Sequence, residues 1–205
     1  MIDEQVQQTV ESYLRSVTSD GAGFDTVVAR HLGWALPDLS RGELAQIDAV
    51  AVDGQVAGLP VQRLTLSAGP VDLVGRQAGS VEATATLGPQ AVAAVVVATS
   101  GFSGATVTSL SQDSIRVSAP SQGSDILLDL QLRAEGGGVT ATAVSASVAG
   151  VALDPATVVP GPLPLLPAET LPAGLLATGV EVSPGPAGAG AVVELRFGCT
   201  DCSLG

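Results

Sequence analysis

Apolar and polar residues alternate with a period of two along most of this chain after about residue 44. In residues 125–133, leucine or isoleucine occupies every even position from 126 to 132, and Asp, Gln or Arg occupies the odd positions from 129 to 133. Successive side chains of a strand point to opposite faces, so this pattern predicts a half-buried β-strand. Hydrophobic residues fill 46% of the 205 positions, yet only five residues are aromatic. The buried faces are therefore expected to be aliphatic.

The same alternation, interrupted by Gly, Pro and Asp turns, predicts an extended series of antiparallel strands. The expected strands cover residues 47–52 (ending at the turn Asp53-Gly54), 61–67, 81–87, 106–110, 114–118, 125–133, 139–148, 176–183 and 191–197. Five prolines between residues 160 and 172 predict an extended, non-helical connector.

Three segments instead have helical features. Apolar residues at three- and four-residue spacing predict an amphipathic helix over residues 2–18, and a short helix is expected over residues 25–32, capped by Gly33. Pro89 in the first turn indicates a further helix over residues 89–99, which is apolar on nearly every side and is therefore expected to be buried. This helix is either a core element under a curved sheet or a helix cradled by the sheet across an aliphatic gap.

These elements predict an α+β fold in which a long, curved antiparallel sheet wraps around the buried apolar helix, with an amphipathic helix at the N-terminus. The length fits a single domain. We expect residues 1–34 to form a helical segment that packs on a β-rich domain of residues 35–205.

The charge of the chain excludes several classes of partner. The net charge is −12, and its basic residues are eight arginines and no lysine. Binding to nucleic acid through phosphates needs a basic surface, as does recruitment to an anionic bilayer, so neither is expected. No run of about 20 apolar residues is present to span a membrane. The acidic start lacks the features of a signal peptide, so the residues themselves leave the compartment open.

The chain also lacks a recognisable catalytic or cofactor-binding motif. His31 is the only histidine, and a histidine next to a helix end usually has a structural role. Ser103 lies in Gly-Phe-Ser-Gly, which only approaches the G-x-S-x-G nucleophile motif. No phosphate-binding loop, dinucleotide fingerprint or metal-ligand motif is present. We therefore predict a protein that is not an enzyme and binds no cofactor or metal.

Two cysteines close the chain as Cys199-Thr-Asp-Cys202. With a single histidine available, this pair lacks the ligands for a zinc site within one subunit unless carboxylates take part. A thioredoxin-like motif would stand between a strand and a helix, whereas here the chain ends. The pair is interpreted as passive thiols or a local disulfide, with a metal shared between subunits and redox catalysis as the alternatives.

Small residues, including alternate positions from 83 to 85 and from 141 to 147, occupy one face of some strands. Such faces either leave room for an acyl chain or allow close packing by the helix of residues 89–99. Each methylene of a buried acyl chain contributes about 0.8 kcal/mol. Composition leaves both readings open.

Residues 35–197 resemble the LmeA-like phospholipid-binding domains of actinobacteria and cyanobacteria. The resemblance rests on the glycine and leucine spacing of Leu39-Ser-Arg-Gly-Glu-Leu44, on Gly58-Leu59 followed by Leu64 and Leu66, and on the proline-rich stretch from residue 163 to 182. It implies a tubular-lipid-binding-like architecture and handling of phospholipid at the cell envelope. It transfers no catalytic residue.

The expected function is non-enzymatic binding of a phospholipid or another fatty-acyl lipid in an aliphatic groove between sheet and helix, with peripheral membrane contact through apolar surface. The alternative is a structural or protein-interaction β-domain with a solid core. The residues expected to line the groove are Leu64, Leu66, Ala83, Ala85, Val92, Val96, Leu128, Leu130, Ala143 and Val180, and Arg63 and Arg116 are the candidates for contact with the head group.

Overall fold

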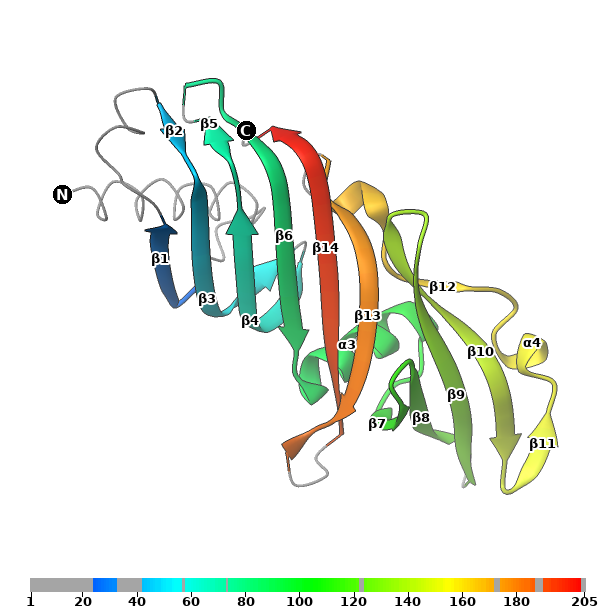
Figure 1. Cartoon of the computed structure of the whole chain (residues 1–205). Coiled ribbons are helices and arrows are strands. Elements are labelled where there is room, and N and C mark those ends of the chain that lie inside the picture. Colours follow the sequence, from blue (N-terminus) through cyan, green and yellow to red (C-terminus); the bar gives the residue numbers. More distant parts are fainter. Residues whose placement is uncertain are drawn as a thin grey trace. The chain divides into compact units, whose positions relative to one another are not determined.

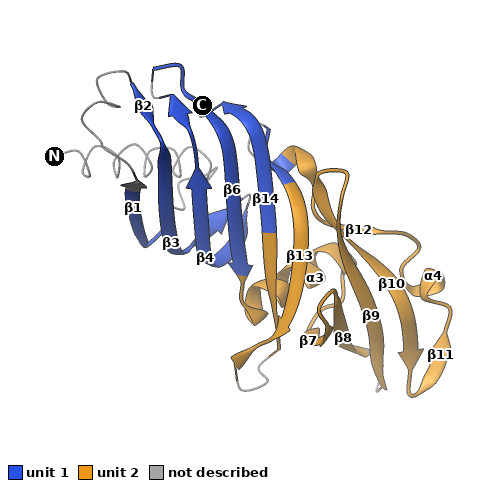
Figure 2. Ribbon diagram, viewed as in Figure 1, with its two compact units in different colours: residues 1–86, 170–176, 196–205 blue, residues 87–169, 177–195 orange. Residues whose placement is uncertain are grey.

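The computed structural model describes residues 24–32, 42–56, 58–72, 74–121, 124–171, 174–186 and 190–203. The chain divides into two compact units, which are coloured separately in Figure 2. Unit 1 comprises residues 1–86, 170–176 and 196–205, and unit 2 comprises residues 87–169 and 177–195. The helix expected over residues 2–18 and the segment boundary expected after residue 34 lie outside the described residues.

The first sheet carries the strands of unit 1 together with most of β13 and the first part of β14, which belong to unit 2 (Figure 1 and Figure 2). Its hydrogen-bonded order is β1-β3-β4-β6-β14-β13, and β5 pairs with both β2 and β6. These strands are β1 (Thr26–Leu32), β2 (Glu43–Leu44), β3 (Gln46–Val56), β4 (Leu59–Ala68), β5 (Val71–Asp72), β6 (Gln77–Leu87), β13 (Leu176–Pro184) and β14 (Ala191–Ser203). The boundary between the two units divides β14 after residue 195.

Strand β1 corrects the helix expected over residues 25–32. It pairs antiparallel with β3, from Thr26 opposite Val52 to Leu32 opposite Gln46. The eight residues of the expected helix are too few to form a stable helix without tertiary contacts, because the first helical turn is costly to nucleate. Pairing with β3 satisfies the backbone hydrogen bonds of this segment. The spacing of apolar residues within the segment could not predict this, because the partner strand is more than a dozen residues away along the chain.

The turn expected at Asp53-Gly54 is instead a kink within β3. Asp53 adopts a left-handed conformation with φ of 51°, and pairing with β4 resumes at Gly54 opposite Val61. The buried positions change there from odd to even, because Ala51 is buried before the kink and Val56 after it. Asp tolerates this backbone region better than most residues do. The Asp53-Gly54 pair therefore indicated an unusual backbone conformation correctly, whereas the prediction that the strand ends in a turn there is wrong.

The second sheet lies in unit 2, with the strand order β11-β10-β9-β8-β7 and with β12 also paired to β10 (Figure 1). Its neighbouring strands are antiparallel. The elements of this part of the chain are α3 (Pro89–Ser100), β7 (Thr106–Ser111), β8 (Ser114–Ser121), β9 (Ser124–Glu135), β10 (Gly138–Val148), β11 (Val151–Leu153), α4 (Pro155–Val158), β12 (Leu163–Leu166) and the 3₁₀ helix η1 (Ala168–Thr170). The proline-rich connector is thus partly the strand β12, and η1 corrects the expectation that it is wholly non-helical.

The helix expected over residues 89–99 is confirmed as α3. It begins at Pro89 and ends at Ser100. The following Gly101 adopts a left-handed conformation, and its N–H donates to the carbonyl of Val97 at 2.9 Å. Within unit 2, α3 contacts β7 and β12. The expectation that this helix is buried is wrong. Its buried residues are Ala91, Val92 and Val96, and other apolar positions of the same helix are half-buried or exposed.

The predicted fold class is therefore wrong. In the described residues the fold is mostly β, with two sheets, and α3 is the only helix longer than four residues. No long sheet wraps around a buried helix. The sequence of α3 is apolar on nearly every side, but composition alone does not determine burial. Burial depends on how many neighbouring elements surround the helix. The alternation of apolar and polar residues predicted the structure better than the apolar composition of α3 did, because alternation depends only on the two faces of each strand.

Candidate functional site

With the exception of Ser109, which lies on β7 opposite Ile115, the side chains of the second sheet that share a face with Leu128 and Leu130 are aliphatic over three cross-strand rows. We call this surface the aliphatic face. Its inner row is Ile115, Leu130 and Ala143; its middle row is Val107, Val117, Leu128, Ala146 and Leu153; its open row is Ala119, Ile126, Val148 and Val151. The rows follow from the pairing register, because residues directly opposite one another in antiparallel strands point to the same face.

Exposure on the aliphatic face rises in two directions. Ile115 and Leu130 in the inner row are fully buried. Along the open row, Ala119 is buried, Ile126 and Val148 are half-buried, and Val151 is 66% exposed. The middle row is buried except at its β11 end, where Leu153 is 40% exposed. The packed core thus grades into exposed aliphatic surface at the hairpin of β10 and β11.

The opposite face of the same sheet is polar and carries a ladder across three strands. Arg116 on β8 donates two hydrogen bonds to Asp129 on β9, from Nε to Oδ1 at 2.7 Å and from the terminal nitrogen to Oδ2 at 2.9 Å. Ser145 on β10 donates to the same carboxylate at 2.7 Å. The hydrogen bond from Arg116 lowers the pKa of Asp129, and the same contact raises the pKa of Arg116.

A second polar group lies farther along these strands. The amide of Gln131 donates to Asp113 at 2.9 Å, and Arg133 donates to the side-chain oxygen of Gln131 at 3.1 Å. The hydrogen bonds from Gln131 and Ser111 lower the pKa of Asp113. Both arginines of unit 2 are thus bonded to side chains of the polar face.

The residues expected to line a single groove are divided between the two units. Unit 1 contains two cross-strand pairs on β4 and β6, Leu64 with Ala85 and Leu66 with Ala83. All four are buried or half-buried. These pairs are part of the packing of the first sheet.

The remaining expected residues belong to unit 2. Leu130 and Ala143 are cross-strand partners, and Leu128 lies in the adjacent row. Val92 and Val96 are two of the buried residues of α3, and Val180 is half-buried on β13. The register therefore brings together Leu128, Leu130 and Ala143, all three on the aliphatic face.

The two arginines proposed to contact a head group do not lie on the aliphatic face. Arg63 is exposed on β4 in unit 1. Arg116 lies on the polar face of the second sheet, where both of its hydrogen bonds go to Asp129. Alternation along β8 puts its side chain on the opposite side of the strand from Ile115 and Val117.

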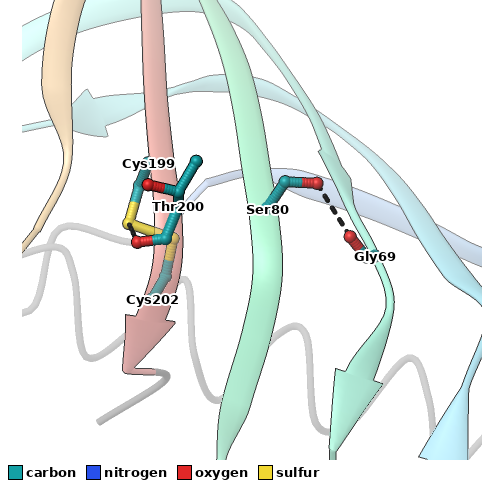
Figure 3. Close-up of a disulfide and its surroundings, with 5 residues drawn as sticks. All are labelled: Gly69, Ser80, Cys199, Thr200 and Cys202. Atoms are coloured by element: carbon teal, nitrogen blue, oxygen red, sulfur yellow. Dashed lines mark hydrogen bonds between the residues drawn. A yellow bond between two sulfur atoms is a disulfide. The ribbon is translucent and has the colours of Figure 1, made fainter.

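The cysteines form a disulfide between Cys199 and Cys202, both on β14 (Figure 3). Strand β14 continues through this pair to Ser203, beyond the expected end at residue 197. Asp201 has φ of 54°, and the buried positions change from odd to even between Phe197 and Cys202. The disulfide therefore spans an irregularity in a strand, and the interpretation as a local disulfide is confirmed. Figure 3 also shows the hydroxyl of Ser80 donating to the carbonyl of Gly69 at 2.7 Å.

The other residues considered for chemistry, His31 and Ser103, belong to different units. His31 lies on strand β1 opposite Ile47, where a helix end was expected. Ser103 is exposed in the loop after α3. Within the described ranges, no three His, Cys, Asp or Glu side chains are grouped so that they could hold a metal ion. The described helices are also all too short or too polar to cross a membrane.

Sequence reasoning missed the two most exposed members of the aliphatic face, Val151 and Leu153. The expected strand ended at Val148, so the three residues of β11 were left unassigned. A signal was present, because Val-Ala-Leu follows Ala149-Gly150 directly and repeats the alternation of β10. A hairpin of this length has too few alternating positions to be recognised without its pairing partner.

Comparison with known proteins gives no relative: no protein-family model, no curated protein and no solved structure matches this chain. The resemblance to the LmeA-like phospholipid-binding domains therefore stays a prediction.

Proposed function

We propose that this protein binds an acyl-chain lipid without catalysing a reaction, through the exposed end of the aliphatic face in unit 2. The observation that carries the proposal is the rise in exposure along a continuous aliphatic surface, from fully buried Leu130 to Val151 at 66% exposed. The middle and open rows of this surface match methylene groups in chemistry, because their side chains offer dispersion contact and no polar group that needs a partner.

The two exposed side chains of β11 supply most of the affinity that the open end can gain. Full burial of a valine or leucine side chain is worth about 1.5–3 kcal/mol. Scaled by the exposed fractions of Val151 and Leu153, which are 66% and 40%, covering both with acyl chains contributes about 2 kcal/mol. The half-buried Ile126 and Val148 beside them extend the same contact.

The test is co-sedimentation of the full chain with vesicles of zwitterionic phosphatidylcholine. We expect the wild-type chain to bind, and the double variant Val151→Ser/Leu153→Ser to bind up to roughly 30-fold more weakly, which corresponds to about 2 kcal/mol. The matched control is Val74→Ser, which replaces an exposed valine of unit 1. A wild-type chain that stays in the supernatant would refute the proposal, as would equal losses in the control and the double variant.

A second candidate function is binding of another protein through a sheet edge. Strand β11 is at the end of the strand order of the second sheet, and its three residues are all exposed. Such an edge can pair with an extended segment of a partner. This alternative predicts that the wild-type chain does not co-sediment with lipid vesicles, so the same experiment distinguishes the two functions.

A further inference from the structure

We infer that the open end of the aliphatic face meets a bilayer surface of zwitterionic or uncharged lipids and discriminates against anionic ones. This inference rests on the proposed function and specifies the class of lipid. It is carried by the distribution of charge along the strands of the aliphatic face. Exposed carboxylates adjoin the half-buried Ile126 and the exposed Leu153, whereas the two arginines of unit 2 adjoin Ile115, Val117 and Leu132, which are buried.

Unit 2 contains two arginines and eight acidic residues. The two arginines, Arg116 and Arg133, lie on the polar face, where Arg116 is bonded to Asp129 and Arg133 to Gln131. A phosphate of a lipid bound at the aliphatic face would be separated from them by the sheet. Neutralising an anionic head group with these arginines would also require breaking the existing hydrogen bonds.

Two carboxylates border the open end. Asp125 is exposed on β9 and directly precedes Ile126 of the open row, and alternation puts its side chain on the polar side of the strand. Asp154 is exposed directly after Leu153, where its side chain accepts a hydrogen bond from the N–H of Ala156 at 3.0 Å. Asp125 is the only charged residue among the described residues that directly adjoin the open row along the chain, and Asp154 adjoins the exposed end of the middle row.

Carboxylates near a bilayer respond to its surface charge because they lie within a Debye length, which is about 8 Å at physiological ionic strength. An anionic surface attracts basic residues, and the same potential repels acidic ones. Zwitterionic head groups present no net charge, so aliphatic contact can proceed without this repulsion. The acidic border thus acts as a selectivity element for an apolar site.

The experiment compares vesicles of phosphatidylcholine with vesicles in which about a third of the lipid is phosphatidylglycerol. We expect binding of the full chain to fall roughly tenfold or more on the anionic vesicles at low salt, and to recover as salt screens the surface. The variant Asp125→Asn/Asp154→Asn should restore most of the lost binding. Asn is as good an N-terminal cap as Asp, so α4 is retained.

The matched control is Asp113→Asn/Glu135→Gln, which removes two exposed charges that lie directly before β8 and at the end of β9, away from Ile126 and Leu153 along the chain. This control should leave the discrimination in place. Anionic vesicles bound as well as zwitterionic ones would overturn the inference, and so would equal restoration by the control, which would assign the effect to total charge. Failure to bind either kind of vesicle would overturn the proposed function itself.

Discussion

Replacing Leu130 by Ala tests whether the inner row of the aliphatic face is a packed core or the lining of a lipid site. Leu130 is 0% exposed and lies between Ile115, also fully buried, and the half-buried Ala143. Truncating a buried leucine removes its transfer free energy and leaves a cavity, with a total cost of about 2–5 kcal/mol. Because Ala143 has no side chain long enough to fill the gap, we expect a loss of about 3 kcal/mol.

The assay is equilibrium unfolding in urea, followed by circular dichroism without lipid. For a denaturant slope of about 2 kcal/mol per molar, this loss lowers the urea midpoint by about 1.5 M. The matched control is Leu153→Ala on the same face, which is 40% exposed and should cost about 1 kcal/mol or less. A loss below about 1 kcal/mol for Leu130→Ala, or equal losses in both variants, would refute solid packing of the inner row.

Two further predictions concern the polar face and the disulfide. Arg116 lowers the pKa of Asp129, so the ion pair stabilises the fold above the ordinary aspartate pKa and this contribution is lost as the pH falls through the lowered value. Asp129→Asn should therefore destabilise the protein by at most about 1 kcal/mol at pH 7. Near pH ~2 the urea midpoints of the variant and the wild type should converge. A difference in urea midpoint as large near pH ~2 as at pH 7 would contradict the ion-pair account. Cys199→Ser/Cys202→Ser should cost about 2 kcal/mol by releasing the short loop, and a reductant should lower the wild-type urea midpoint to that of the variant while leaving the variant unchanged. A wild-type midpoint insensitive to a reductant shown to open the disulfide would contradict this prediction.

Local pattern was sufficient for the elements whose own residues determine them. The even-numbered aliphatic residues of 125–133 predicted β9, and the proline and glycine at the ends of residues 89–99 predicted α3. In both cases the signal is a repeat or a cap contained within one segment. The segment of residues 25–32 contains no such signal, because its few apolar positions fit either a helix or a strand, and pairing with β3 decided between them.

The candidate site was predicted in part. Sequence alone indicated an aliphatic interior, and it selected Leu128, Leu130 and Ala143, which the register brings onto one face. It did not reveal that Leu64 and Ala85 belong to a different compact unit, nor that Arg116 is bonded to Asp129. Both facts depend on which strands pair, and pairing joins residues that are distant along the chain.

The sequence by itself determined that the apolar residues are mainly aliphatic, that several segments have the two-residue alternation of β-strands, and that the net charge is −12. The tertiary structure decided where the aliphatic surface is closed and where it is open. Leu130 and Val151 are both aliphatic residues on strands, yet one is fully buried and the other is 66% exposed. Periodicity assigns a side chain to one side of its strand, whereas burial depends on the neighbouring strands, and β11 is at the edge of its sheet.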